Sequence, residues 1–374
     1  MGKCIHCGNE SSLISQFLGL CRECILKDFQ VVESRIRRAH KVSREPFDLP
    51  SSPPDKSDGL ACTSCLNQCR MEKGDTGYCG VRENPEGTKL TPPPKQGYCS
   101  WYYDSLPTNC VADWVCPAGT GTGFPEYSHT RGPEYGYKNL AVFYHGCTFN
   151  CLFCQNWHYR ENLRDKTPHS SQELAQAVDR MTSCICYFGG DPSPQILHSI
   201  HTSRLALERR NKQILRLCWE TNGTMNSRYL EEILHIALES GGCVKFDLKT
   251  FHQSLNVALC GQGNDQTKRN FELAAKWTQK RKDPPLVVAS TLLVPGYIER
   301  EEVFQIAKFV ADRDPDIPYA LLGFHPHFYF RDMPVTSRRH AEECRQVAEE
   351  AGLRKVRIGN IHLLGKEYSG CGSG

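Results

Sequence analysis

Three cysteines, Cys147, Cys151 and Cys154, stand within eight residues of one another in the segment GCTFNCLFCQNW, and their number limits what they can do. A structural zinc site takes four ligands, and disulfides use cysteines in pairs. Thiolates are also the usual ligands of iron–sulfur clusters. In a cubane cluster, three thiolates hold three of the irons and leave the last iron open to a small molecule. The triad therefore favours a 4Fe–4S cluster that does chemistry at its open iron.

The triad follows the first strand of a regular alternation of strands and helices. Strands are expected at 140–145, 185–188, 215–220, 244–248, 286–293, 319–324 and 356–358. Helices are expected at 171–181, 227–239, 267–280, 300–312 and 337–351. This repetition requires a parallel sheet with helices outside it. We therefore predict an α/β fold, a partial (β/α)6-type TIM barrel, over residues 138–365.

Polar and glycine-rich motifs follow the predicted strands. They are FGGDPSP (188–194), ETNGT (220–224), FDLK (246–249), STLLVPG (290–296) and GFHPH (323–327). In a barrel of this kind, the carboxyl ends of the strands meet at one rim, where the chemistry takes place. The motifs therefore predict a pocket beside the triad. His325 and His327 are expected to face this rim, either as structural histidines or as substrate contacts.

The CxxxCxxC spacing, the strand before it and the rim motifs together resemble the radical S-adenosylmethionine (SAM) superfamily. The resemblance covers about residues 59–365 and is nearest to the glycyl-radical-enzyme activase branch. It implies that the open iron binds SAM and that a 5′-deoxyadenosyl radical abstracts hydrogen from carbon. The SAM-binding positions that it implies are Phe153 near the adenine, Gly189, Gly190 and Asp191 at the amino group, and Asn222, Asp247 and Lys249 around the ribose and carboxylate. Asp191 stands where the family has glutamate.

Two cysteine quartets precede the barrel. Cys4, Cys7, Cys21 and Cys24 have nearly the spacing of a zinc ribbon, which favours structural zinc over an iron–sulfur cluster. The second quartet, which could bind zinc or a second iron–sulfur cluster, comprises Cys62, Cys65, Cys69 and Cys79. With the CQNW and FGGDPSP segments, it resembles the activase-like enzymes of AmmeMemoRadiSam gene sets.

These features divide the chain into five predicted parts. They are a zinc-ribbon-like module (1–26), a linker (27–58), a Cys-rich and aromatic auxiliary segment (59–137), the barrel (138–365) and a tail (366–374). Residues 91–127 are expected to be mostly loop, with Trp101, Tyr102, Tyr103 and Trp114 available to line a cavity. The remaining thiols are expected to be small buried groups: Cys99, Cys110, Cys116, Cys184, Cys186, Cys218 and Cys243. For Cys99, Cys110 and Cys116, the alternative is an extra metal ligand.

Composition limits the partners and the compartment. The 374 residues carry a net charge of only +3 and no dense basic stripe, which argues against nucleic acid. The sequence shows neither a signal-like N-terminal run nor an apolar stretch of 18 residues, so we predict a cytoplasmic protein without membrane contact. An odd number of cysteines, 21, mostly in CxxC-type clusters, indicates metal binding in a reducing compartment.

Three functions follow as hypotheses. The first is a radical SAM enzyme that modifies a carbon of a protein or peptide, supplied with electrons by a low-potential ferredoxin or flavodoxin. Within it, cobalamin-dependent C-methylation is favoured, as in the methyl-coenzyme M reductase glutamine C-methyltransferase, although the chain has no Asp-x-His-x-x-Gly motif. The second is a glycyl-radical-enzyme activase. The third, an electron carrier without catalysis, is the weakest because a carrier would coordinate all four irons.

Overall fold

The central element is an open sheet with the strand order β14-β13-β12-β11-β10-β9-β7-β6. The structure is a computed structural model that describes residues 1–211 and 213–368, so residues 369–374 of the predicted tail lie outside the described part. The strands that run parallel are β7 (Lys138–Tyr144), β9 (Thr182–Gly189), β10 (Arg216–Thr221), β11 (Val244–Asp247), β12 (Val287–Leu293), β13 (Tyr319–Gly323) and β14 (Val356–Gly359). The predicted α/β fold and partial barrel are confirmed.

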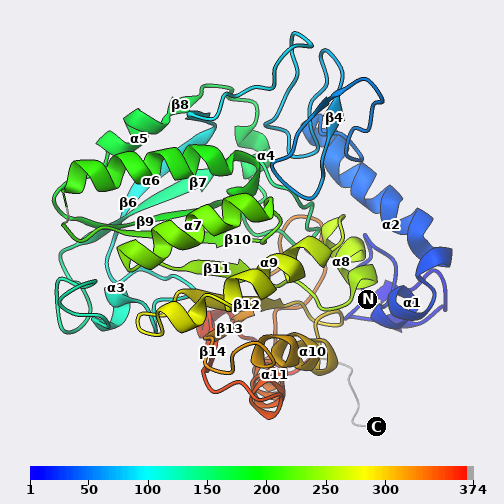
Figure 1. Ribbon diagram of the computed structural model, residues 1–374. Coiled ribbons are helices and arrows are strands. Elements are labelled where there is room, and N and C mark those ends of the chain that lie inside the picture. Colours follow the sequence, from blue (N-terminus) through cyan, green and yellow to red (C-terminus); the bar gives the residue numbers. More distant parts are fainter. Residues whose placement is uncertain (212, 369–374) are drawn as a thin grey trace.

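Helices connect the parallel strands and cover the outer face of the sheet (Figure 1). They are α5 (Ser171–Gln176), α6 (Ile196–Arg210), α7 (Ser227–Ser240), α8 (Gln253–Cys260), α9 (Asp265–Ala275), α10 (Arg300–Ala311) and α11 (Arg338–Glu350). Local sequence sets their ends. α7 begins where Asn226 Oδ1 accepts a hydrogen bond of 3.2 Å from the N–H of Arg228, and it ends at Gly241, whose φ is 77°.

One expectation about the segments before the barrel is confirmed and one is wrong. Residues 91–127 are mostly loop, as expected, but they also contain β6 (Cys99–Ser105), which pairs antiparallel with the whole of β7 and forms the edge of the sheet. The predicted linker at 27–58 contains α2 (Phe29–Arg44), a helix of 16 residues. Val32, Ile36 and Ala39 are buried on one side of α2 and belong to the main apolar core. Their spacing is that of one helix face, so the segment is folded onto the barrel.

The N-terminal module is also attached to the barrel. The hydroxyl of Tyr297, which follows β12, donates a hydrogen bond of 2.9 Å to the Leu20 carbonyl and accepts one of 3.1 Å from the Ser15 N–H. Figure 1 shows this end of the chain beside α8 and α10.

The shorter strands and helices are β1 (Gly2–Lys3), β2 (Glu10–Ser11), α1 (Arg22–Lys27), β3 (Leu60–Ala61), β4 (Arg70–Met71), β5 (Gln96–Gly97), α3 (Pro117–Thr120), α4 (Tyr159–Asn162) and β8 (His169–Ser170).

The 3-10 turns lie at 45–47, 193–195, 278–280 and 361–363. Among the helices of the described residues, none combines the length and the apolar character that crossing a membrane requires.

Candidate active site

The loop after β7 carries the cysteine triad, and hydrogen bonds to the end of α8 fix its position. The N–H groups of Asn150 and Leu152 donate hydrogen bonds of 2.7 and 2.9 Å to the carbonyls of Cys260 and Leu259, at the end of α8. Cys147 and Cys151 are buried, and Cys154 is partly exposed. The Cys147 sulfur accepts hydrogen bonds from Phe149 N at 3.4 Å and Asn222 Nδ2 at 3.8 Å. Such donors stabilise a metal-bound thiolate.

The ends of the neighbouring strands bring every predicted SAM-binding residue to the same cavity as the triad. This cavity has a volume of about 160 Å³ and is called the rim pocket below. Its lining includes Cys147, Cys151, Cys154, Phe153, Gly189, Gly190, Asp191, Asn222, Asp247 and Lys249. The structure therefore brings these residues together, while their roles toward SAM stay predictions.

The two glycines after β9 are required by close backbone contact. A Cβ on Gly189 would lie 2.4 Å from the nitrogen of Tyr144, and one on Gly190 would lie 2.2 Å from the carbonyl oxygen of Gly146. The φ of Gly189 is also positive, at 123°. Only glycine lets the end of β9 lie this close to the segment that leads into the triad.

Asp191 is buried, and the Thr221 hydroxyl donates to its carboxylate at 2.7 Å. Burial raises the pKa of Asp191 to about 6, even though hydrogen bonds from Thr221 and Ser193 favour the charged form. A cationic group bound beside this carboxylate would stabilise its charge. The shorter aspartate thus still supplies an acceptor in the rim pocket, but one that is already bonded on one side.

The remaining predicted residues differ in how free they are to bind a ligand. Lys249 forms an ion pair with Asp247, and this carboxylate raises the pKa of Lys249 although burial opposes the charge. Asp247 Oδ1 is buried without a hydrogen-bond partner. By contrast, the Asn222 amide is engaged on both sides, with Thr148 Oγ1 at 2.8 Å and Thr224 Oγ1 at 2.7 Å. Asn222 therefore supports the Cys147 loop directly.

Sequence reasoning missed Arg160, which also lines the rim pocket. Its side chain is almost fully buried, and its Nη2 donates a hydrogen bond of 3.0 Å to Asn150 Oδ1. The Nε and Nη1 groups have no partner among the described residues. Unpaired buried donors are costly, so this guanidinium fits a site that holds an anion. Its position six residues after Cys154, in CQNWHYR, was the only available signal.

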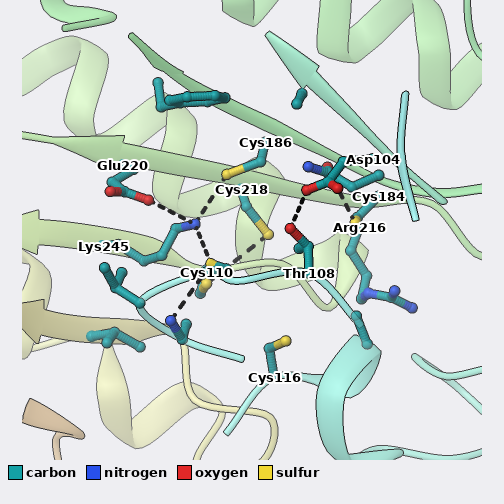
Figure 2. Close-up of a pocket in the computed structure, with 18 of the residues that line it drawn as sticks. Asp104, Thr108, Cys110, Cys116, Cys184, Cys186, Arg216, Cys218, Glu220 and Lys245 are labelled. Carbon is teal, nitrogen blue, oxygen red and sulfur yellow. Dashed lines mark hydrogen bonds and ion pairs between the residues drawn. The ribbon is translucent and has the colours of Figure 1, made fainter. Parts of the chain in front are cut away.

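A second cavity, shown in Figure 2, lies on the inner face of the sheet. It has a volume of about 230 Å³ and is called the lumen cavity below. The two cavities share Asn156, Phe188 and Glu220 in their linings. A group in the lumen cavity can therefore reach toward the rim pocket. The lining also includes Arg216 on β10, which forms a buried ion pair of 2.5 Å with Glu134, before β7.

The lumen cavity is lined by six thiols from the strands and from the segment after β6: Cys110, Cys116, Cys184, Cys186, Cys218 and Cys243. They are buried or partly buried, as expected, but they are gathered in one place, which their sequence positions did not indicate. Lys245 Nζ lies 3.0 Å from the sulfurs of both Cys110 and Cys186 and 3.3 Å from Glu220 Oε2 (Figure 2). The hydrogen bond with Cys186 and the Lys245 charge lower the pKa of Cys110 to about 7, against burial.

The N-terminal quartet has the geometry of a single-ion site. The sulfurs of Cys4, Cys7, Cys21 and Cys24 all lie within 4.8 Å of one another, and those of Cys7 and Cys21 are 3.8 Å apart. Tetrahedral zinc with Zn–S bonds of about 2.3 Å places its sulfurs about 3.8 Å apart. Backbone N–H groups of Cys7 and Cys21 lower the pKa of Cys4 to about 6 although burial acts in the opposite direction. The quartet fits zinc.

The histidines after β13 do not line the rim pocket. His325 is exposed and His327 is partly exposed, with their ring centroids 5.0 Å apart.

The residues present in the rim pocket fit a three-cysteine cluster with a small ligand. The groups available to bind are three thiols, the Asp247 Oδ1 atom and the Nε and Nη1 nitrogens of Arg160. The last three atoms have no hydrogen-bond partner among the described residues. Burial raises the pKa of Cys147 and Cys154, so binding of a metal cluster there would release protons.

Comparison with known proteins agrees with this fit. Residues 141–310 match the family model described as the Radical SAM superfamily. An uncharacterised protein of Methanocaldococcus jannaschii is 25% identical over 315 residues, which cover 81% of each chain. Another protein of that organism, named as a candidate glycyl-radical enzyme activating enzyme, is 25% identical over 58% of this chain and 88% of its own length.

Two solved structures show more distant likeness. A domain of pyruvate-formate lyase-activating enzyme from Bacteroides vulgatus aligns with a TM-score of 0.37 and 20% identity, over 47% of this chain and 98% of that domain. Streptococcus suis SuiB bound to its precursor peptide SuiA aligns with a TM-score of 0.43 and 15% identity, over 58% and 47% of the two chains.

Proposed function

We propose that this chain, whose residues 141–310 match the Radical SAM superfamily model, is a radical SAM enzyme that cleaves SAM reductively and modifies a carbon atom of a protein or peptide substrate. The observation that carries the proposal is the rim pocket, where the cysteine triad, the Asp247–Lys249 pair and the glycine-lined end of β9 surround one cavity. When bound there, the cluster and SAM supply a 5′-deoxyadenosyl radical that abstracts a hydrogen atom from carbon.

The residues of the chain have separate tasks in this reaction. Cys147, Cys151 and Cys154 would hold the cluster, and Asp191 would accept hydrogen bonds from the SAM amino group. Lys249 would interact with the SAM carboxylate. Phe153, whose ring centre lies 6.0 Å from Lys249 Nζ, would pack near the adenine. The buried setting of the pocket keeps water away from a reactive intermediate.

The lumen cavity supports a substrate that presents a long side chain or an extended segment. It adjoins the rim pocket, and its lining combines apolar residues and thiols with polar side chains such as Asp104, Asn139 and Lys245. A target carbon held between the two cavities would lie beside the radical, and this position determines which hydrogen is removed. Glu220 and Lys245, paired at the junction, can orient a polar group of the substrate.

Cobalamin-dependent C-methylation is the finer form of this proposal. This finer proposal rests on the sequence alone. The structure adds no support, because the described lining of the lumen cavity includes no imidazole that could bind cobalt. The cavity of about 230 Å³ is also below the usual size of a site for a drug-sized ligand, roughly 300–1,000 Å³. A corrinoid would thus need a rearrangement of the segment after β6.

The alternative is a glycyl-radical-enzyme activase, which is favoured by the name of the relative that aligns over 88% of its own length. One experiment separates the two functions. The reconstituted protein is incubated with methyl-deuterated SAM, with and without methylcobalamin, and with candidate protein substrates. A mass gain of one deuterated methyl group, with formation of both 5′-deoxyadenosine and S-adenosylhomocysteine, would establish methylation. A persistent glycyl radical without mass gain would establish the activase.

A further inference from the structure

The second cysteine quartet, Cys62, Cys65, Cys69 and Cys79, is built differently from the N-terminal quartet. All four residues are at most 9% exposed. Within the described part of the chain, no three of their sulfurs lie within 4.8 Å of one another, whereas all four sulfurs of the N-terminal quartet do. The three sulfurs of the rim-pocket triad likewise do not all lie within 4.8 Å of one another. Since the thiolates of a cubane bind different irons, its sulfurs lie farther apart than those around one zinc ion.

The surroundings of the second quartet suit a negatively charged cluster. The Tyr78 N–H donates a hydrogen bond of 3.4 Å to the Cys69 sulfur. Arg44 is 1% exposed, lies 3.7 Å from the centre of the Tyr78 ring and donates to the Tyr78 carbonyl. A 4Fe–4S cluster in its oxidised form with four thiolates carries a net charge of −2, and a buried guanidinium beside it offsets part of the cost of burying that charge.

Backbone contacts join this quartet directly to the triad. A Cβ on Gly146 would lie only 2.9 Å from the Cys79 carbonyl oxygen. Asn67 Nδ2 donates a hydrogen bond of 2.9 Å to the Thr148 carbonyl. Gly146 and Thr148 are the residues on either side of Cys147. The loop of the second quartet therefore packs against the triad loop, with no other element between the two.

Part of the second quartet also borders a surface cavity. Cys62 and Cys65 line a cavity of about 340 Å³ together with Arg70, Asn226 and Gln266. Arg70 is exposed, and Arg228 Nη2 lies 3.3 Å from Thr63 Oγ1, between the first two cysteines of the quartet. This face of the quartet thus carries polar and basic groups, which suit a protein partner with an acidic surface.

We propose that Cys62, Cys65, Cys69 and Cys79 hold a second 4Fe–4S cluster, which is the entry point for the electron used at the rim pocket. The role in electron transfer rests on the proposed function, but the presence of the cluster does not. One electron passes from a small acidic iron–sulfur or flavin protein to the quartet and reduces its cluster from the 2+ to the 1+ state. The electron then passes to the cluster of the triad. Its transfer to SAM would break one carbon–sulfur bond and give methionine and the 5′-deoxyadenosyl radical. Both clusters then return to the 2+ state.

The experiment measures metal content and spectra before any activity. The variant Cys147→Ala/Cys151→Ala/Cys154→Ala is reconstituted anaerobically with iron and sulfide. We expect it to keep about four irons and four sulfides per chain beyond the zinc of the N-terminal quartet. On reduction it should give a 4Fe–4S electron paramagnetic resonance signal that SAM does not alter. A variant that binds no iron, or that binds a second zinc in its place, overturns the proposal even if the native protein cleaves SAM.

A second pair of variants tests the route of the electron. In Cys62→Ala/Cys65→Ala, the ratio of SAM cleavage driven by a flavodoxin system to cleavage driven by dithionite should fall at least tenfold. The matched control, Cys344→Ala, removes a buried thiol on α11 and should keep the native ratio and both clusters. An unchanged ratio in the double variant, with the second cluster absent, would overturn the role in electron transfer.

Discussion

At the scale of single residues, the rim pocket contains one charged group that no motif indicated. Arg160 is held by Asn150, and Asn150 in turn bonds His40 and Ser43 of α2. The guanidinium also lies 4.4 Å from the centres of the Tyr159 and Phe328 rings. These contacts fix its position while two of its N–H groups stay unpaired. We interpret Arg160 as a positioning residue that stabilises the anionic cluster.

Replacing Arg160 with methionine should weaken the cluster site while leaving the barrel folded. Groups that support metal ligands typically contribute about 10–100-fold to metal affinity or activity. We expect 5′-deoxyadenosine release to fall by roughly tenfold or more, and the midpoint potential of the cluster to become more negative because a nearby positive charge is lost. Arg160→Lys is the matched control, since it keeps the charge and should recover part of the potential. Equal potentials in all three proteins would contradict this role.

At the scale of elements, the sequence predicted the seven parallel strands because each combines an apolar run with a polar motif at its end. It did not predict α2, whose only buried apolar residues are Val32, Ile36 and Ala39 in a helix with many charged side chains. Nor did it predict β6, because the proline and glycine content around it is typical of loops. The triad and its neighbours were predictable from spacing. The lumen thiols were not, because their juxtaposition depends on the register of three strands.

Packing between α6 and β7 makes a specific prediction about acid stability. His198 on α6 is buried, and its Nδ1 shares a hydrogen bond of 2.7 Å with the Tyr144 hydroxyl on β7. Burial lowers the pKa of His198 from the usual 6.5 to about 4. Between these two values the unfolded chain binds more protons than the folded chain. The free energy of unfolding should therefore fall, by up to about 3 kcal/mol from this group, as the pH drops from about 6.5 to 4.

The variant His198→Gln tests this contribution, because glutamine can accept the hydrogen bond from Tyr144 but does not titrate. Urea unfolding of the native protein and the variant is compared at pH 7 and at pH 4.5. The difference in unfolding free energy should shift in favour of the variant by about 2–3 kcal/mol at the lower pH. Parallel losses in the two proteins would show that His198 does not titrate as described.

At the scale of the whole molecule, the N-terminal module and the barrel form one packed unit. A Cβ on Gly296 would lie 2.1 Å from the Leu13 carbonyl oxygen, and Gln16 N donates a hydrogen bond of 2.7 Å to Asp332 Oδ2. These contacts join the module to the loops after β12 and β13, on the same rim as the candidate active site. Zinc in the N-terminal quartet would thus support the fold beyond the module itself.

The variant Cys21→Ser should therefore lose zinc and lower the melting temperature of the whole protein. We expect the loss of one zinc per chain and a decrease of roughly 5–10 °C in Tm, with the iron content of the triad unchanged. Metal analysis and differential scanning calorimetry under anaerobic conditions measure both quantities. Retention of zinc, or loss of iron together with zinc, would contradict the assignment of separate sites.

The most direct test of the central claim is SAM cleavage by the anaerobically reconstituted protein. Native protein reduced with dithionite should release 5′-deoxyadenosine and methionine from SAM. The variant Cys147→Ala/Cys151→Ala/Cys154→Ala should release none above background while keeping a native circular dichroism spectrum. Equal 5′-deoxyadenosine release by the two proteins, or none by native protein with a fully assembled cluster, would contradict the claim that the triad and the rim pocket form a radical SAM active site.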